Sequence, residues 1–349
     1  MINEDYTGNL LEDYKPYLLG GYHLAIMPIS RVEVEWSPLT YPAEITFYPV
    51  EWVELDNLGI IPNKSHGKSP AEIISFTSGV DQEILNSHPL IVFPCNFNWR
   101  KFRSSNHRSH MEFIRTLSNY VDKMCLNFIR YLQCPIDNMH ALPGKVGTIN
   151  SNRMMSGALL YNHSLKEGRI IGGDAFTHAI TRGLGLPIES VEHNLFPKEG
   201  EVGSIINHAL ALYTLLLETE SPTFRFVQAL SLLEFLANPD EYQKFAEVSK
   251  IISRYIAKDR HEYKRLLDRF FALTGKKDLA TNEYIGLRTR IVHLGGRLEE
   301  IIPQEEQRKD LFIELGSYIK AVIDHMIKHS EMTWVDYLAI RDNLRPYEI

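Results

Sequence analysis

The sequence predicts an α+β N-terminal domain followed by an all-α antiparallel helical bundle, with the boundary near residue 195. Before that boundary, short apolar runs with the two-residue period of strands surround one long helical pattern. After Pro197, apolar residues recur every three or four positions, which is the period of amphipathic helices. A chain of 349 residues can form two domains with separate cores. We place these domains at residues 1–195 and 196–349.

Strands are expected in the first domain where stretches are rich in β-branched and aromatic residues, or alternate polar with apolar residues. These stretches cover residues 24–29, 31–36, 44–50, 90–93 and 157–161. One long helix is expected from about His110 to Leu132, because apolar residues between Phe113 and Phe128 follow helical spacing. Pro135 should end this helix, since proline cannot donate the next helical hydrogen bond.

The second domain is expected to contain six helices and an appended C-terminal helix. The predicted ranges are about 205–218, 226–237, 242–256, 262–273, 281–294 and 312–326, with the appended segment at 334–349. Gly275 is expected to cap the fourth helix and Gly295-Gly296 to close the fifth. In the fifth helix, the buried face should consist of Tyr284, Leu287, Ile291 and Leu294. Helices with one apolar face and short connections are typical of an antiparallel bundle.

Composition and charge narrow the classes of function. The formal net charge is −7, whereas proteins that coat duplex DNA are usually basic. No apolar run approaches the roughly 20 residues that cross a bilayer, and the acidic N-terminus does not resemble a signal peptide. We therefore expect a cytoplasmic protein without a membrane partner. The three cysteines lack metal-binding spacing and are interpreted as reduced thiols in or near a core.

The fifth predicted helix carries an arginine and a histidine that suit phosphodiester chemistry. Arg288 and His293 are separated by about 7.5 Å of helical rise. A guanidinium can bind two phosphate oxygens, and an imidazole can transfer a proton. The spacing alone is weak evidence, because similar pairs occur elsewhere in the chain: Arg100 with His107, Arg103 with His110, and Arg254 with His261.

Residues 200–330 as a whole resemble the HEPN superfamily, most closely its ApeA-like branch. The resemblance lies in the first long helix, in the run from Ala229 to Glu234, and in Leu287-Arg288-Thr289-Arg290-Ile291-Val292-His293 followed by glycine and a final long helix. The family motif is an arginine, then four to six residues beginning with a polar one, then a histidine. Arg288, Thr289 and His293 match this motif, although asparagine or aspartate is more common at the position of Thr289.

The resemblance implies a helical bundle that forms a homodimer, with two copies of the motif facing each other. Active members cut RNA without metal, leave a cyclic phosphate, and commonly serve in prokaryotic antiviral defence or as toxin-like effectors. Arg288 and His293 would then be catalytic, Thr289 would make a supporting hydrogen bond, and Glu234 would orient Arg288. We therefore expect a metal-independent endoribonuclease. The alternative is an inactive dimerisation or nucleotide-binding module, with function carried by the first domain.

Further basic residues are candidates for RNA contact. Those in the second domain are Lys264, Arg265 and Arg290, and those in the first domain are Arg100, Lys101 and Arg103. Acidic residues lie among the basic residues of the middle helices, so a solvated, ion-paired surface is the plainer interpretation there.

No cofactor or metal is expected. His107 and His110 lack further ligands at a suitable spacing, and the sequence contains no phosphate-binding Walker loop and no GxSxG motif. The first domain is expected to bind a trigger ligand or a partner protein, whose chemistry the sequence leaves open.

Overall fold

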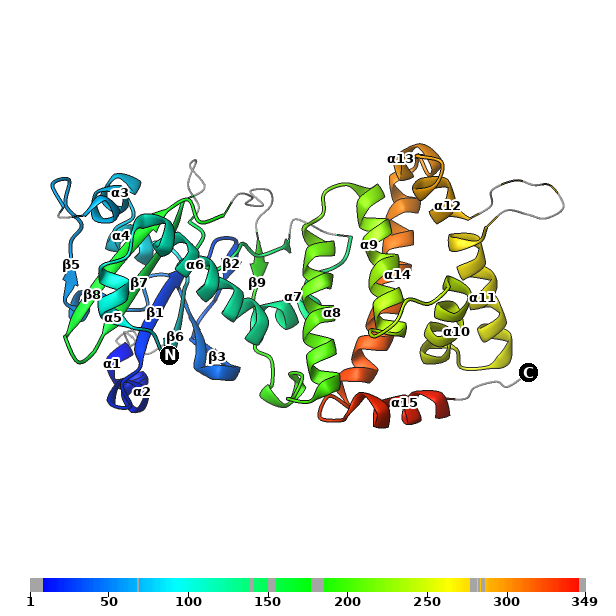
Figure 1. Ribbon diagram of the computed structural model, residues 1–349, viewed down its shortest axis with the longest axis horizontal. Helices are drawn as coiled ribbons and strands as arrows, with labels where there is room; N and C mark the ends of the chain where they lie inside the picture. Colours follow the sequence, from blue (N-terminus) through cyan, green and yellow to red (C-terminus); the bar gives the residue numbers. More distant parts are fainter. Residues whose placement is uncertain are drawn as a thin grey trace. The chain divides into compact units, whose positions relative to one another are not determined.

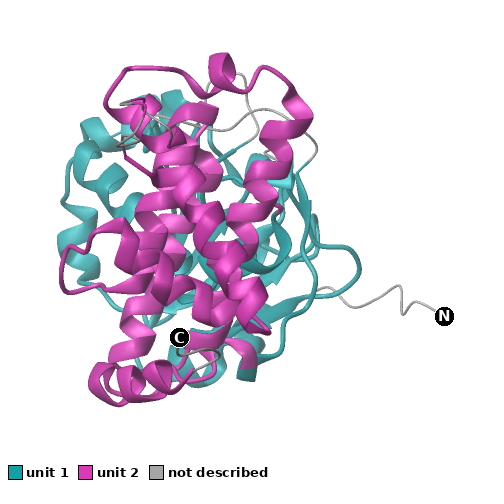
Figure 2. Cartoon of the chain, turned by 90° about the vertical axis from the view of Figure 1, so that its right-hand side faces the viewer, with its two compact units in different colours: residues 1–134, 138–194 teal, residues 135–137, 195–349 magenta. Residues whose placement is uncertain are grey.

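The computed structural model describes residues 9–67, 69–137, 141–149, 155–176, 185–276, 281, 283 and 286–344. The chain divides into two compact units, which Figure 2 shows in different colours. Unit 1 comprises residues 1–134 and 138–194, and unit 2 comprises residues 135–137 and 195–349. Unit 1 combines a sheet with helices, whereas the regular elements described in unit 2 are all helical.

Unit 1 is built on a seven-stranded sheet in the order β3-β4-β6-β1-β7-β8-β5 (Figure 1). The strands are β1 (His23–Pro28), β3 (Leu39–Tyr41), β4 (Ile45–Tyr48), β5 (Ile60–Ile61), β6 (Leu90–Cys95), β7 (Ser156–Asn162) and β8 (Glu167–Gly173). All pairs are antiparallel except β5 with β8. A separate parallel pair joins β2 (Val32–Glu33) to β9 (Leu186–Pro187).

Four of the five expected strands are confirmed, and the fifth is only partly present. The stretch 31–36 supplies only the two-residue strand β2, since Arg31 has a φ of 59° and the chain bends after Glu35. Four strands were not expected: β3, β5, β8 and β9. The largest of these, β8, contains three glycines, which weaken the strand signal in the sequence.

Helices cover both faces of the sheet. They are α1 (Leu10–Asp13), α2 (Lys15–Leu19), α3 (Pro70–Ser78), α4 (Gln82–Asn86), α5 (Trp99–Arg103), α6 (His107–Val121) and α7 (Asn127–Gln133). Leu24 and Ile26 of β1 pack in a cluster with residues of α1, α2 and α4. On another part of the sheet, the Phe93 ring lies 5.6 Å from the Tyr120 ring of α6. Because both faces of β1 are buried, its sequence is an unbroken run of apolar residues rather than an alternating one.

The long helix expected at 110–132 contains an interruption. A π-helical turn at Asp122–Leu126 joins α6 to α7, and the helix ends at Gln133, before Pro135. The turn carries a buried charge cluster. The Asp122 carboxylate accepts hydrogen bonds from Arg130 at 2.8 Å and from Lys145 at 3.2 Å, and Arg130 is fully buried. These two cations hold the pKa of Asp122 below its usual value, despite burial.

Unit 2 contains α8 (Glu201–Glu218), α9 (Pro222–Ala237), α10 (Phe245–Ile256), α11 (Arg260–Thr274), α12 (Leu287–Val292), α13 (Leu298–Ile301), α14 (Glu305–Ile327) and α15 (Trp334–Asn343). Helices α8, α9 and α14 pack on one another, and α10 packs on α9, α11 and α14 (Figure 1). The expected helical series is confirmed. Two details differ, because α12 is much shorter than predicted and α13 was not expected.

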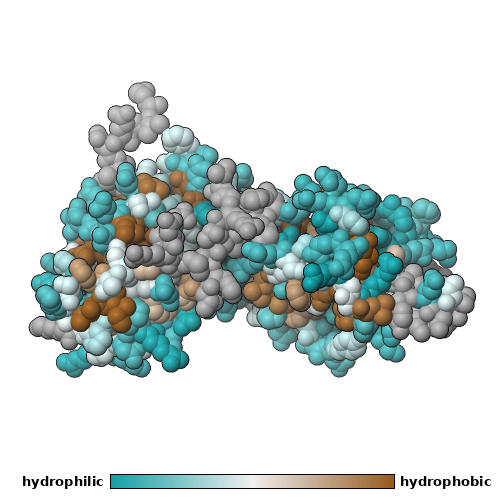
Figure 3. Space-filling view, turned by 90° about the horizontal axis from the view of Figure 1, so that it is seen from above, coloured by the Kyte–Doolittle hydropathy of each residue, from teal (hydrophilic) through white to brown (hydrophobic). Residues whose placement is uncertain are grey.

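The surface is mixed in character. Figure 3 shows hydrophobic residues as separate patches among hydrophilic ones on the face that is drawn. Cys125 and Cys134 are buried and Cys95 is half-buried, and all three are free thiols, as expected. No helix within the described ranges is both long and apolar enough to cross a membrane.

Candidate active site

The short helix α12 is held against the end of α11 by two glycines. The Gly286 amide donates to the Gly275 carbonyl at 3.2 Å, and a Cβ atom on Gly286 would lie only 2.2 Å from that oxygen. Gly286 therefore allows a close backbone approach that any side chain would prevent. It also precedes the first turn of α12, so the helix predicted from Thr281 begins at Leu287 instead. Tyr284, assigned to the buried face, lies outside the described residues.

Thr289 lies on the buried side of α12. Its side-chain hydroxyl donates to the Gly275 carbonyl at 3.0 Å, and the residue is 6% exposed. The sequence assigned Thr289 a supporting hydrogen bond at the site. The structure directs that bond to the backbone, so Thr289 helps to fix the position of the helix that carries Arg288.

Arg288 reaches from α12 to α9. Its Nη2 atom lies 3.4 Å from Oε1 of Glu234, and the two side chains are 30% and 21% exposed. The structure thus brings together the arginine and the glutamate that the HEPN resemblance paired. Burial raises the pKa of Glu234, and the nearby guanidinium offsets only part of this effect. The ion pair positions Arg288 at some cost to the carboxylate.

His293 follows the last turn of α12 and is exposed. Its backbone amide donates to the Thr289 carbonyl at 3.0 Å, and Gly295, with a φ of 71°, then turns the chain away. The imidazole has no hydrogen-bond partner within the described part of the chain. Leu294 is 57% exposed, so its predicted place in the buried face is wrong. The histidine can therefore meet a substrate from solvent.

The candidate RNA contacts fall into two groups. Arg290 on α12 and Lys264 and Arg265 on α11 are exposed in unit 2, where Arg265 lies 3.4 Å from Glu262. Arg100, Lys101 and Arg103 are exposed on the short helix α5 in unit 1.

The structure contains a polar network between α10, α14 and α15 that was not predicted from the sequence. The Tyr337 hydroxyl lies 3.0 Å from the Tyr255 hydroxyl and 3.0 Å from Nδ1 of His325. Burial, with a smaller effect of His329 and Lys328, lowers the pKa of His325 to about 4. The spacing of four residues between His325 and His329 was visible in the sequence, but the partners of His325 on other helices were not.

Comparison of the chain with protein-family models, with curated proteins and with solved structures found no match of any of the three kinds. Among the residues that the structure describes, no three His, Cys, Asp or Glu side chains gather in a way that could hold a metal ion. The chemistry of the site must therefore be argued from its own residues.

Proposed function

We propose that this protein is a metal-independent endoribonuclease of the HEPN type. The observation that carries the proposal is the arrangement on α12. Arg288 is oriented by Glu234 of a neighbouring helix, and an exposed His293 stands at the end of the same six-residue helix. This arrangement agrees with the roles that the HEPN resemblance implies for the three residues.

The two side chains supply what RNA transesterification requires. The 2′-oxygen attacks the adjacent phosphorus, a new P–O bond closes the cyclic phosphate, and the bond to the 5′-oxygen breaks. His293 acts in proton transfer, either from the 2′-hydroxyl or to the leaving 5′-oxygen. Arg288 binds the phosphate oxygens, whose charge increases in the transition state.

The surroundings of His293 also fit the expected homodimer. Val292 and Leu294 flank it and are 46% and 57% exposed, although both are large apolar residues. Apolar side chains at a motif are suited to burial by a second copy of the chain. The proposal places this dimer in antiviral defence or toxin-like growth arrest.

The test is cleavage of RNA by the purified protein in EDTA, followed by identification of the product ends. We expect cyclic phosphate and 5′-hydroxyl ends. The variants Arg288→Ala and His293→Ala should each lower the rate by about 100-fold or more, which is the usual contribution of such groups. Circular dichroism should show unchanged helical content.

The chain provides a matched control pair. Arg254 lies 3.6 Å from Asp342 and is 36% exposed, close to the environment of Arg288, and His261 is an exposed histidine on α11. Arg254→Ala and His261→Ala should cleave RNA at the wild-type rate. The nuclease proposal is wrong if wild type leaves RNA intact, or if His293→Ala cuts as fast as His261→Ala.

The non-catalytic alternative is favoured by one observation, namely that Arg288 is already bound to a carboxylate. An inactive binding module would be expected to bury both motif residues in ion pairs, whereas His293 is exposed. A protein that dimerises and binds a nucleotide, but leaves RNA whole, would support this alternative.

A further inference from the structure

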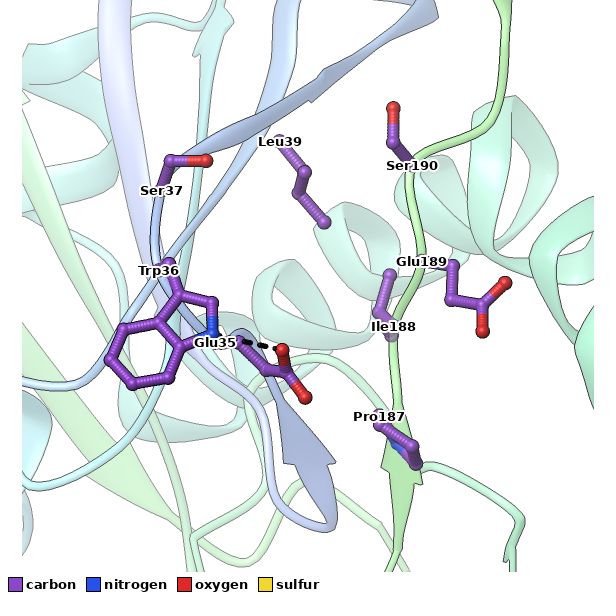
Figure 4. Close-up of a pocket in the computed structure, with 8 residues that line it drawn as sticks. All are labelled: Glu35, Trp36, Ser37, Leu39, Pro187, Ile188, Glu189 and Ser190. Carbon is purple, nitrogen blue, oxygen red and sulfur yellow. Dashed lines mark hydrogen bonds between the residues drawn. The ribbon is translucent and has the colours of Figure 1, made fainter.

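A pocket of about 410 Å³ lies in unit 1, where the chain leaves the β2/β9 pair. One wall is the segment 35–37, and the other is the segment 187–190 (Figure 4). The two walls are joined below the pocket, since the Ile188 amide donates to the Glu33 carbonyl at 2.9 Å. Leu39 and Ile188 contribute apolar side chains to the lining of the pocket.

The second wall is held firmly by side chains from elsewhere in unit 1. The Gln133 side-chain amide donates to the Glu189 carbonyl at 3.0 Å, and its oxygen accepts from the Glu189 amide at 3.3 Å. The Tyr41 hydroxyl donates to the same carbonyl at 3.1 Å. The backbone of this wall is thus preorganised, which reduces the entropic cost of binding a ligand.

The first wall presents an aromatic ring and a carboxylate together. Trp36 is 73% exposed, although the structure buries Trp99 and Trp334 almost completely. The Trp36 indole donates to the Glu35 carboxylate at 3.0 Å (Figure 4), and the second carboxylate oxygen has no hydrogen-bond partner among the residues that the structure describes. The Glu35 carboxylate lies on the Pro187 side of the ring, whereas the Glu189 side chain points away from Trp36.

The charged residues that line the pocket, Glu35 and Glu189, are both acidic. An exposed indole face attracts cations, and arginine is the more frequent partner in proteins because its planar guanidinium can stack on the ring. The apolar side chains of Leu39 and Ile188 additionally favour a cation that ends an alkyl chain.

We propose that this pocket binds an alkylguanidinium group, which is the side chain of arginine either in a polypeptide or in a small molecule. The guanidinium would stack on Trp36 and pair with the second carboxylate oxygen of Glu35, while its alkyl chain would contact Leu39 and Ile188. This site is independent of the proposed RNA cleavage, and it assigns a chemical class to the trigger or partner expected for the first domain.

The test uses the full-length protein labelled with ¹⁵N and follows the tryptophan indole signals by NMR. The probe is Nα-acetyl-arginine-N-methylamide, and its control is the citrulline analogue, which has nearly the same shape without the charge. We expect the arginine probe, and not the citrulline probe, to shift the Trp36 signal to saturation. That signal is assigned by its loss in Trp36→Phe.

Variants locate the site. Trp36→Ala should weaken binding by about 3- to 30-fold, as expected for a cation–π contact, measured by calorimetry. Glu35→Gln should weaken it by about 2- to 5-fold, the usual range for an exposed ion pair. Glu83→Gln, an exposed glutamate on α4, should bind like wild type.

Free L-arginine compared with the blocked arginine separates the two sources, because tighter binding of the blocked form indicates a polypeptide and tighter binding of the free amino acid a small molecule. The proposal is overturned if the arginine probe causes no saturable shift at millimolar concentration, or if the citrulline probe binds equally well.

Discussion

Glu234 illustrates how one carboxylate can serve a site without stabilising the fold. Its pKa is raised by burial, so the folded state disfavours the charged form relative to the unfolded chain. The ionised carboxylate therefore lowers the free energy of unfolding at pH values above its folded-state pKa. Glu314 is the opposite case. It is also partly buried, but hydrogen bonds from Arg269 and Tyr318 outweigh burial and lower its pKa.

We predict different effects of glutamine at these two positions on stability at pH 7. Glu234→Gln should leave the free energy of unfolding unchanged or raise it by up to about 1 kcal/mol, because a costly charge is removed. Glu314→Gln should lower the free energy by about 1 kcal/mol, since an Arg–carboxylate pair is broken. Urea denaturation of both variants measures the effect. A loss well above 1 kcal/mol in Glu234→Gln would show that the pair with Arg288 is structural.

The position of α12, the helix that carries the candidate site, depends on the close backbone contact between Gly275 and Gly286. The backbone of Gly286 has a φ of −73°, which any residue can adopt. The close approach to the backbone of Thr274 and Gly275 excludes a side chain there. The position of a six-residue helix thus depends on the absence of one Cβ atom.

Gly286→Ala should therefore lower the free energy of unfolding by about 1–3 kcal/mol, as overpacking does elsewhere. Gly296→Ala, beyond the other end of α12, is the control. A Cβ atom there would lie 3.2 Å from its nearest neighbours, so a small shift can accommodate it. Denaturation measures the stability, and limited proteolysis around residue 286 reports the position of α12. Equal stability of the two variants would contradict a close backbone contact at Gly286.

Elements were predictable from the sequence to the extent that their signals are local. The helices of unit 2 repeat an apolar pattern over three or more turns, so their existence followed from spacing. Helix α12 was predicted too long, because its start depends on contact between Gly286 and Gly275, which are 11 residues apart. The π-helical turn depends on the packing of Asp122 and Arg130, and strand β8 forms through pairing with β7 despite its glycines. Such partners are not encoded by local periodicity.

The candidate site likewise has features that could be predicted from the sequence and features that could not. Arg288 and His293 were found from their residue types and the HEPN resemblance, and the role of Glu234 was implied by that resemblance. The inward direction of Thr289 could not be foreseen, since it depends on a carbonyl of another helix. The pocket beside Trp36 gave no sequence signal, because its walls are 150 residues apart along the chain.

At the scale of the whole molecule, the network around His325 joins three helices of unit 2 and makes the free energy of unfolding depend on pH. Tyr255, Tyr337, His329 and Lys328 surround this imidazole, and Arg341 acts on the two tyrosines. The folded protein keeps His325 neutral down to about pH 4. The unfolded chain protonates a histidine below about pH 6.5, so it binds more protons than the folded state between these values.

Stability should therefore fall as the pH is lowered from about 6.5 to 4. His325 accounts for about 1–2 kcal/mol of this loss, after allowance for its partial exposure to solvent. We predict that His325→Gln flattens the pH dependence of the unfolding free energy in this window, whereas His261→Gln on the surface of α11 does not. Equilibrium unfolding at pH 7 and pH 5 provides the comparison. Parallel pH profiles of wild type and His325→Gln would rule out this role.

The buried cluster of Asp122, Arg130 and Lys145 also changes the electric field outside the protein. It contains two cations and one anion, a net charge of +1, in a chain whose formal net charge is −7. The remaining groups, most of them on the surface, therefore total −8. An approaching RNA feels this repulsion only within about one Debye length, roughly 8 Å at physiological ionic strength, because salt screens the charges at longer range. Binding of RNA by this protein would therefore depend on short-range contacts. A moderate salt concentration would speed the encounter by screening the repulsion, but it would weaken the final complex.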